Sequence, residues 1–208
     1  MSQTQATLVY VGDPMCSWCY GIAPELAKAV KSLEKEAELE IVMGGLRPYN
    51  TETMVELGDF LRKHWQHVHQ ASGQEFSYGI LDNKTFVYDT EPPSRAVLVV
   101  RKLRPEKEFA FFKAIQDAFY QDNQNTNYLE TYLPLVRELG IDEAAFRREF
   151  LSDDMKEATR RDFQRAANLG VRSFPTLLLR KGDEYHVIAN GFAKSEQIVS
   201  TVRSLVNQ

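Results

Sequence analysis

The two cysteines of the chain stand three residues apart, in the segment Cys16-Ser17-Trp18-Cys19. A short apolar segment precedes them, a Gly-Asp-Pro breaker lies between at 12–14, and helix-forming residues follow. In the first turn of a helix, unpaired backbone N–H groups and the positive end of the helix dipole stabilise a thiolate. This position predicts Cys16 as a nucleophile. Cys19, one turn deeper on the same side of the helix, is predicted as the thiol that resolves a disulfide formed by Cys16.

Zinc binding is one alternative use of a Cys-x-x-Cys pair. A structural zinc site needs four ligands, so the other two would have to be histidines. His67 and His69 would point about 160° apart on a helix and cannot hold one ion together, although His64 and His67 could. A second alternative makes the cysteines small buried hydrophobic residues, but chance would rarely place the only two cysteines at this spacing on a strand-to-helix turn. We therefore expect no metal site.

A strand, a helix and a second strand must position this pair. Residues 7–11 are β-branched and aromatic, which predicts a strand, and residues 17–35 carry apolar side chains at helical spacing. Pro24 lies inside that helix and should kink it. Residues 39–43 predict a second strand, closed by two glycines. A helix between two strands so close in sequence predicts a parallel pair.

The middle of the chain has a helical repeat and no convincing strand, which predicts a helical insertion. Helices are expected over about 52–70, 93–104, 106–121, 126–139, 142–151 and 153–169. Asp142 and Ser152 are expected as N-caps and Gly170 as a C-terminal stop. Pro93 is expected at a first helical position, and Pro134 should kink or divide its helix.

Strand patterns return after the insertion. Residues 176–180 and 185–189, joined by a Lys-Gly-Asp turn, predict a β-hairpin, and Ser195 is expected to cap a closing helix. The order β-α-β, many helices, β-β-α predicts an α/β fold. Residues 1–48 and 171–208 would form one domain and residues 49–170 a helical insertion domain, whose last helix can pack on the sheet.

Composition narrows the classes of function. The chain has 208 residues, of which 43% are hydrophobic and 26% charged, as in ordinary globular proteins. Its net charge of -4 provides no electrostatic attraction to phosphate, so we expect no nucleic-acid partner. The N-terminus lacks the pattern of a signal peptide, and no apolar run has the length of a membrane span. We expect a cytoplasmic protein, a monomer or homodimer, with no membrane partner. Motifs for phosphate, dinucleotide or hydrolase sites do not occur, so no cofactor is expected besides the dithiol itself.

A second informative segment is Phe174-Pro175-Thr176. A proline just before a strand is permitted without any function. Combined with the Cys-x-x-Cys segment, however, it makes the sequence resemble the thioredoxin superfamily. Within that superfamily it is most similar to the DsbA-like oxidoreductases with a helical insertion, in particular the FrnE-like group of protein-disulfide isomerases. The resemblance spans the whole chain and also includes Pro24 and Gly191.

The resemblance implies a thioredoxin fold and a thiol-disulfide oxidoreductase or protein-disulfide isomerase. Its partners would be protein or small-molecule disulfides and thiols, with glutathione as a possible co-substrate. Pro175 would be a cis-proline lying against the sulfurs, and Phe174 would offer backbone groups to an extended substrate, with a bulky ring that narrows access. Trp18 is expected either at an exposed turn beside the reactive sulfur, where it would contact substrate, or as an ordinary partly buried aromatic residue. Many relatives carry a buried acid where this chain has Tyr10, so water or another group must move the proton of Cys19.

The residues between the cysteines bear on the direction of exchange. Ser17 and Trp18 carry no positive charge to stabilise a thiolate, so we expect a reduction potential below that of the strongly oxidising DsbA type. Such a potential favours a reductase or isomerase in a reducing cytosol.

Two other functions stay open. The first is a glutathione-dependent isomerase or transferase of the kappa-class or hydroxychromene-carboxylate isomerase type, although those proteins usually have serine in place of the first cysteine. The second is a redox-sensing or chaperone-like binder that holds clients on an apolar groove of the insertion.

Overall fold

The computed structural model describes residues 6–207 and contains one four-stranded sheet in the order β2-β1-β3-β4. The strands are β1 (Ala6–Gly12), β2 (Ala37–Met43), β3 (Thr176–Lys181) and β4 (Glu184–Asn190). Strand β1 pairs parallel with β2 and antiparallel with β3, and β3 forms the predicted hairpin with β4. Strands β1 and β3 therefore form the centre of the sheet. β1 leads directly into the cysteine segment, and β3 follows the Phe174-Pro175 segment.

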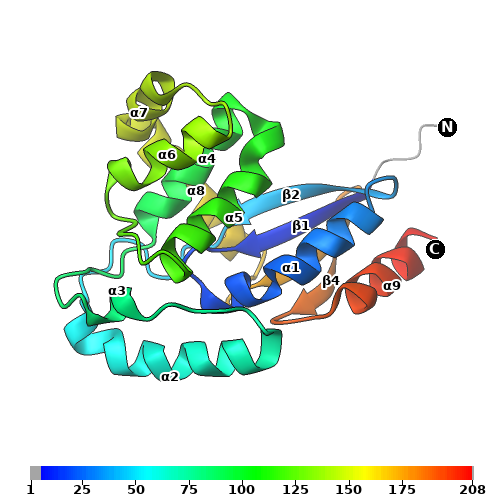
Figure 1. Ribbon diagram of the computed structural model, residues 1–208. Coiled ribbons are helices and arrows are strands. Elements are labelled where there is room, and N and C mark those ends of the chain that lie inside the picture. The colour runs from blue at the N-terminus through cyan, green and yellow to red at the C-terminus, as the bar shows by residue number, and fades with distance from the viewer. Residues whose placement is uncertain (1–5, 208) are drawn as a thin grey trace.

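Helices cover both faces and extend beyond one end of the sheet (Figure 1). They are α1 (Ser17–Ser32), α2 (Met54–Ser72), α3 (Gly79–Asp82), α4 (Glu91–Leu103), α5 (Glu108–Tyr120), α6 (Tyr132–Glu138), α7 (Glu143–Leu151), α8 (Asp153–Asn168) and α9 (Ser195–Val206), with two short 3-10 helices, η1 (Pro105–Lys107) and η2 (Leu129–Thr131). Figure 1 shows α4 to α7 stacked at one end and α2 running beside α1. Helices α4 to α7 of the insertion thus lie at one end of the sheet, and its helix α2 lies along the side of α1.

The alternation of side chains along β1 explains the layers. Leu8 and Tyr10 point to the face covered by α1 and α9, whereas Val9 and Val11 point to the opposite face and pack with Ala166 of α8. Both faces of the sheet carry apolar side chains because helices cover both of them. The last helix of the insertion therefore packs on the sheet, as the sequence allowed.

The insertion is also linked to β2 by partly buried charges. Arg101 of α4 donates to Glu108 at 2.7 Å, to Asp162 at 3.1 Å and to the carbonyl oxygen of Ile41 at 2.7 Å. The same carboxylate of Asp162 accepts the N–H of Met43 at 2.9 Å. One guanidinium thus links α4, α5, α8 and the strand that ends beside the cysteines.

The predicted helix caps are confirmed in part. Asp142 accepts the N–H of Ala145 at 2.6 Å and Ser152 accepts that of Met155 at 3.2 Å, and Gly170 has a φ of +73°. These three residues end or begin their helices as expected.

Two predicted helix starts are wrong. Ser195 is the first residue of α9 and not its cap, because its N–H donates across the domain to Glu25 of α1 at 2.9 Å. Helix α4 begins at Glu91 and not at Pro93, since a proline without an N–H is tolerated throughout the first turn. Pro134 falls in the first turn of α6, and the segment before it forms η2, so the helix expected over 126–139 is divided.

A second core lies inside the insertion. Its buried members, called here the aromatic cluster, are Met15, Tyr20, Met54, Leu57, Leu61, Trp65, Ile80, Leu81, Phe86, Tyr88, Phe119 and Tyr120. Ten of them come from the insertion, but Met15 and Tyr20 flank the cysteine pair. The insertion therefore packs directly on the cysteine segment. Within residues 6–207, no helix combines the length and the apolar character needed to cross a membrane.

Candidate active site

Cys16 is the N-cap residue of α1, with extended backbone angles of φ -82° and ψ 117°. Its N–H donates to the carbonyl oxygen of Asp13 at 3.0 Å, which closes the turn between β1 and α1. The sulfur therefore lies at the end of the helix where backbone N–H groups have no helical partner. Cys16 is only 5% exposed, so little of the residue is open to a substrate.

Cys19 lies one turn further along α1 and is completely buried. Both cysteines are thiols, and their sulfurs lie within hydrogen-bonding reach of each other. Burial raises the pKa of Cys19 well above its ordinary value, and the neighbouring Cys16 raises it further. Cys19 therefore keeps its proton in the resting protein, as a shielded second thiol should.

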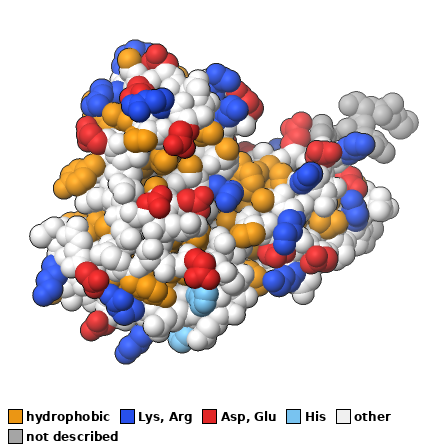
Figure 2. All heavy atoms as spheres, viewed as in Figure 1, with side chains coloured by type: hydrophobic (Ala, Val, Ile, Leu, Met, Phe, Trp, Pro, Cys, Tyr) orange, Lys and Arg blue, Asp and Glu red, His pale blue; other side chains and the backbone are white. Residues whose placement is uncertain are grey.

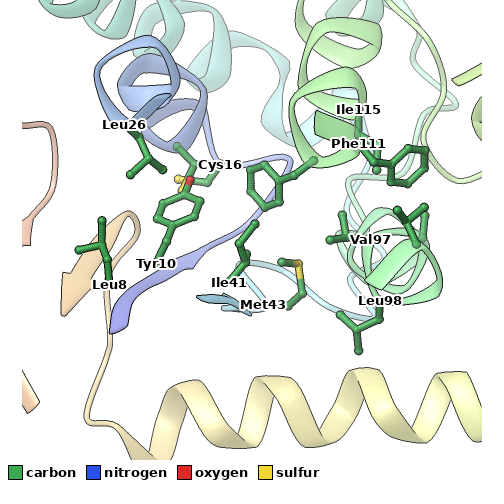
Figure 3. Packing of buried hydrophobic residues seen from close by; sticks show 14 of the residues in the cluster. Leu8, Tyr10, Cys16, Leu26, Ile41, Met43, Val97, Leu98, Phe111 and Ile115 are labelled. Atoms are coloured by element: carbon green, nitrogen blue, oxygen red, sulfur yellow. The ribbon is translucent and has the colours of Figure 1, made fainter. Parts of the chain in front are cut away.

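Tyr10 lies on β1, at the position where many proteins of the resembling family carry a buried acid. Its ring extends from β1 towards Cys16 (Figure 3), and its hydroxyl group is close enough to Cys19 to lower the pKa of that thiol. Burial raises the pKa of Tyr10 itself well above the ordinary value, so the hydroxyl group stays protonated. Gly12 makes room for this ring, because a Cβ atom there would lie 2.6 Å from Tyr10 Cζ. The sequence did not indicate that Tyr10 itself can act on the thiol of Cys19.

The segment before β3 faces Cys16 with its backbone. The Cys16 thiol donates to the carbonyl oxygen of Phe174 at 3.5 Å, and the peptide bond between Phe174 and Pro175 is cis. The ring of Phe174 packs over Gly44 at the end of β2. It is therefore the main chain of Phe174 that lies beside the sulfur.

Trp18 is half-buried, which is the second of the two environments that the sequence left open. Its ring meets that of His64 edge-on at 6.1 Å, and His64 stacks on Phe60 at 5.6 Å. The reason is that α2 packs beside α1 and covers part of the indole. Figure 2 shows histidine side chains at the surface over α2.

Two of the histidines considered for zinc, His64 and His69, are engaged elsewhere. His64 lies between two aromatic rings, and His69 Nδ1 hydrogen-bonds to the carbonyl oxygen of Gln74 at 2.8 Å. In the part of the chain that the structure describes, no three His, Cys, Asp or Glu side chains come together as a group that could hold a metal ion.

Asp13 is a site residue that the sequence reasoning missed. Its buried carboxylate accepts the N–H of Met15 at 2.9 Å and the N–H of Leu46 at 2.7 Å. Burial raises its pKa to about 6, although both hydrogen bonds lower it. Asp13 therefore ties the cysteine turn to the segment after β2. The only sequence signal was a Gly-Asp-Pro triplet, which also fits an ordinary strand breaker.

The chain is similar to known proteins over almost its full length. A sequence model of the family described as thioredoxin matches residues 9–200. A solved structure of a candidate protein disulfide isomerase from Nitrosomonas europaea is 35% identical, with a TM-score of 0.91 and 98% of each chain covered. The cytosolic disulfide reductase DsbM from Pseudomonas aeruginosa is 25% identical, with a TM-score of 0.82, 97% of this chain and 98% of that chain covered.

A more distant likeness concerns the fold alone. The oxidoreductase DsbA1 from Neisseria meningitidis is 14% identical, with a TM-score of 0.58, 100% of this chain and 85% of that chain covered. No curated protein sequence matches the chain.

Proposed function

The chain belongs to the thioredoxin family, with the DsbA-like fold in which a helical insertion divides the thioredoxin domain, and we propose that it exchanges disulfides with protein or small-molecule thiols through Cys16 and Cys19. The observation that carries the proposal is the position of Cys16. Its sulfur lies at the N-terminus of α1 against the backbone of Phe174, with the buried thiol of Cys19 behind it.

The first step forms a mixed disulfide. The Cys16 thiolate attacks one sulfur of a substrate disulfide, a bond forms between these two sulfurs, and the substrate S–S bond breaks. The second substrate sulfur leaves as a thiolate and takes a proton from solvent. The N-terminal N–H groups of α1 favour the attacking thiolate.

The second step releases the substrate. Cys19 gives up its proton to water and attacks the sulfur of Cys16, which forms the Cys16–Cys19 disulfide and expels the remaining substrate sulfur as a thiolate, which takes up a proton from solvent. The substrate has then gained two electrons and the protein has lost two. Tyr10 lowers the pKa of Cys19, and we propose that its hydroxyl group donates to the Cys19 thiolate that must form in this step and stabilises it.

We propose reduction of substrates as the physiological direction, with glutathione as the electron donor. Two glutathione molecules would each give one electron and one proton to the Cys16–Cys19 disulfide, and glutathione disulfide would leave. The similarity to the cytosolic disulfide reductase DsbM, for which a structure with glutathione exists, supports this direction and a cytoplasmic location. Isomerisation would use the same mixed disulfide, but a second thiolate of the substrate would attack it, form a new disulfide within the substrate and release Cys16 as a thiolate, with no net change of oxidation state.

Phe174 and Trp18 are the residues we propose to contact substrate. The carbonyl oxygen of Phe174 lies 3.5 Å from the Cys16 sulfur, where an extended peptide or glutathione could pair with the main chain. The indole of Trp18 lies on the same turn of α1 as both sulfurs and can pack against the substrate.

Reduction of insulin and oxidation of a dithiol peptide test the proposal at defined ratios of glutathione to its disulfide. The wild type should turn over in at least one direction. Cys16→Ser should abolish turnover, and Cys19→Ser should stop it after one event and leave a trapped mixed disulfide. Glutathione transfer that survives Cys19→Ser without any disulfide turnover would contradict the proposal and favour a glutathione transferase.

A further inference from the structure

Met15, the residue before the nucleophile, is fully buried, and every polar atom that it has is engaged. Its N–H donates to Asp13 Oδ1 at 2.9 Å, and its sulfur accepts the hydroxyl group of Thr126 at 3.2 Å. Its carbonyl oxygen accepts two hydroxyl groups, that of Tyr120 at 2.6 Å and that of Tyr88. Three of these four partners, Thr126, Tyr88 and Tyr120, belong to the helical insertion.

The two tyrosines are held firmly in place. Both are buried in the aromatic cluster, where Phe119 packs on Tyr88 at 6.0 Å and on Tyr120 at 4.8 Å. Burial raises the pKa of both hydroxyl groups well above the ordinary value, so both keep their protons and donate. A carbonyl oxygen has two lone pairs, and these two donors use both.

The hydrogen bonds on Met15 fix the peptide group that leads into Cys16. The carbonyl group of Met15 and the N–H of Cys16 belong to one planar unit, whose N–H donates to Asp13 at 3.0 Å. The carbonyl oxygen of Cys16 in turn accepts the N–H of Tyr20 at 3.0 Å, so the peptide groups on both sides of Cys16 are held. The backbone angles of Cys16 are thereby fixed, and with them the direction in which its side chain leaves the main chain towards Phe174. The hydroxyl hydrogens also cover a carbonyl oxygen whose negative charge would oppose a thiolate next to it.

We propose that Tyr88 and Tyr120 are positioning residues for Cys16, through which the helical insertion sets the reactivity of the nucleophile. The inference rests on the proposed function only in taking Cys16 as the reacting thiol. It gives the insertion a part in the chemistry, besides any role in binding substrate.

The test uses Tyr88→Phe, Tyr120→Phe and the double variant that combines these two changes. Each is compared with the control Tyr20→Phe. Tyr20 is a matched control because it lies in the same aromatic cluster and its hydroxyl group also donates to a backbone carbonyl oxygen, that of Glu75, at 2.9 Å. The rate of Cys16 alkylation by iodoacetamide is measured from pH 5 to 9, with the modified residue identified by mass spectrometry. The initial rate with oxidised glutathione is measured beside it.

We expect each single variant to slow alkylation at pH 7 about twofold to threefold, since one hydroxyl group still satisfies the carbonyl oxygen. The double variant should slow it about tenfold or more, beyond the product of the single effects, because a buried carbonyl oxygen then has no partner. The midpoint of its pH profile should move to higher pH. If the double variant does not fold, the comparison of each single variant with Tyr20→Phe decides the question.

Alkylation needs no disulfide exchange, so the two proposals can fail separately. If the wild type exchanges no disulfides but the tyrosine variants alkylate more slowly than Tyr20→Phe, the positioning role stands and the proposed function falls. If the wild type exchanges disulfides and all tyrosine variants match Tyr20→Phe in rate and pH profile, the positioning role is overturned.

Discussion

The ring of Phe174 fills the space where a side chain at residue 44 would lie: a Cβ atom on Gly44 would come within 2.2 Å of Phe174 Cε1. Gly44 in turn donates its N–H to the carbonyl oxygen of Gly12 at 2.7 Å, at the end of β1. The ends of β1 and β2 and the segment before β3 therefore meet at this ring. Since the backbone of Phe174 faces Cys16, the packing of the Phe174 ring on Gly44 also positions the Phe174 carbonyl group beside the reactive sulfur.

Gly44→Ala should therefore impair both stability and chemistry. The added methyl group must displace the Phe174 ring, and overpacking of this kind costs about 1–3 kcal/mol in the free energy of unfolding. The displaced residue carries its carbonyl group away from Cys16, so the rate of reaction with a disulfide substrate should fall several-fold. Urea unfolding and single-turnover kinetics measure the two effects.

A second substitution in the same chain is the control. Phe174→Leu removes the ring atoms that the new methyl group meets, so the double variant should recover most of the stability lost by Gly44→Ala. If Phe174→Leu instead adds its own loss to that of Gly44→Ala, the two residues do not share this space.

Tyr10→Phe should slow the second step of exchange and leave the first nearly unchanged. Tyr10 lowers the pKa of Cys19, and without its hydroxyl group the Cys19 thiolate loses the hydrogen bond proposed for it in this step. A hydrogen bond to a charged group contributes about 1.5–3 kcal/mol, so the mixed disulfide on Cys16 should live at least about tenfold longer. Rapid quenching followed by mass spectrometry measures that lifetime.

The matched control for Tyr10→Phe is again Tyr20→Phe, whose hydroxyl group is directed to Glu75. Alkylation of Cys16 should stay close to the wild-type rate in both variants. A mixed disulfide that resolves equally fast in Tyr10→Phe and in Tyr20→Phe would remove Tyr10 from the mechanism.

Features set by local sequence could be predicted well. The strand-helix-strand unit, the hairpin and the principal helices follow from side-chain periodicity, and Asp142 and Ser152 cap their helices through bonds to residues three positions on. Cys16 and Cys19 could be proposed as the reacting pair because their motif lies within one turn of chain.

Features set by distant contacts could not be predicted. Helix α3 has only four residues, and its Ile80 N–H is held by Asn123 Oδ1 at 2.8 Å. Ser195 lost its expected capping role to a contact with Glu25, 170 residues away. Tyr88 and Tyr120 stand 73 and 105 residues from Met15, and nothing in their local sequence indicates that both hydroxyl groups meet at its carbonyl oxygen.

The buried carboxylate of Asp13 should make stability depend on pH. Burial raises its pKa from 3.8 to about 6, so between these values the folded protein holds a proton that the unfolded chain has lost. Its stabilising contribution is complete below about pH 4 and is lost as the pH rises through about 6. The shift corresponds to about 3 kcal/mol.

Asp13→Asn isolates this contribution, because an amide does not titrate. The free energy of unfolding of the wild type minus that of Asp13→Asn, measured in urea from pH 4 to 8, should fall by up to about 3 kcal/mol as the pH rises to 6 and then level off. A difference that stays constant over this range would show that Asp13 ionises at the same pH in the folded and unfolded chain.

Trp18 should report the redox state of the cysteines. The chain has two tryptophans: Trp18 lies between Cys16 and Cys19 in sequence, and Trp65 is fully buried in the aromatic cluster. A disulfide beside an indole quenches its emission, so reduction should raise the fluorescence of Trp18 and leave that of Trp65 unchanged. Titration with dithiothreitol should therefore give a full response in Trp65→Phe and none in Trp18→Phe. A response that persists in Trp18→Phe and vanishes in Trp65→Phe would mean that the signal comes from a change in the insertion and that the indole of Trp18 does not sense the sulfurs.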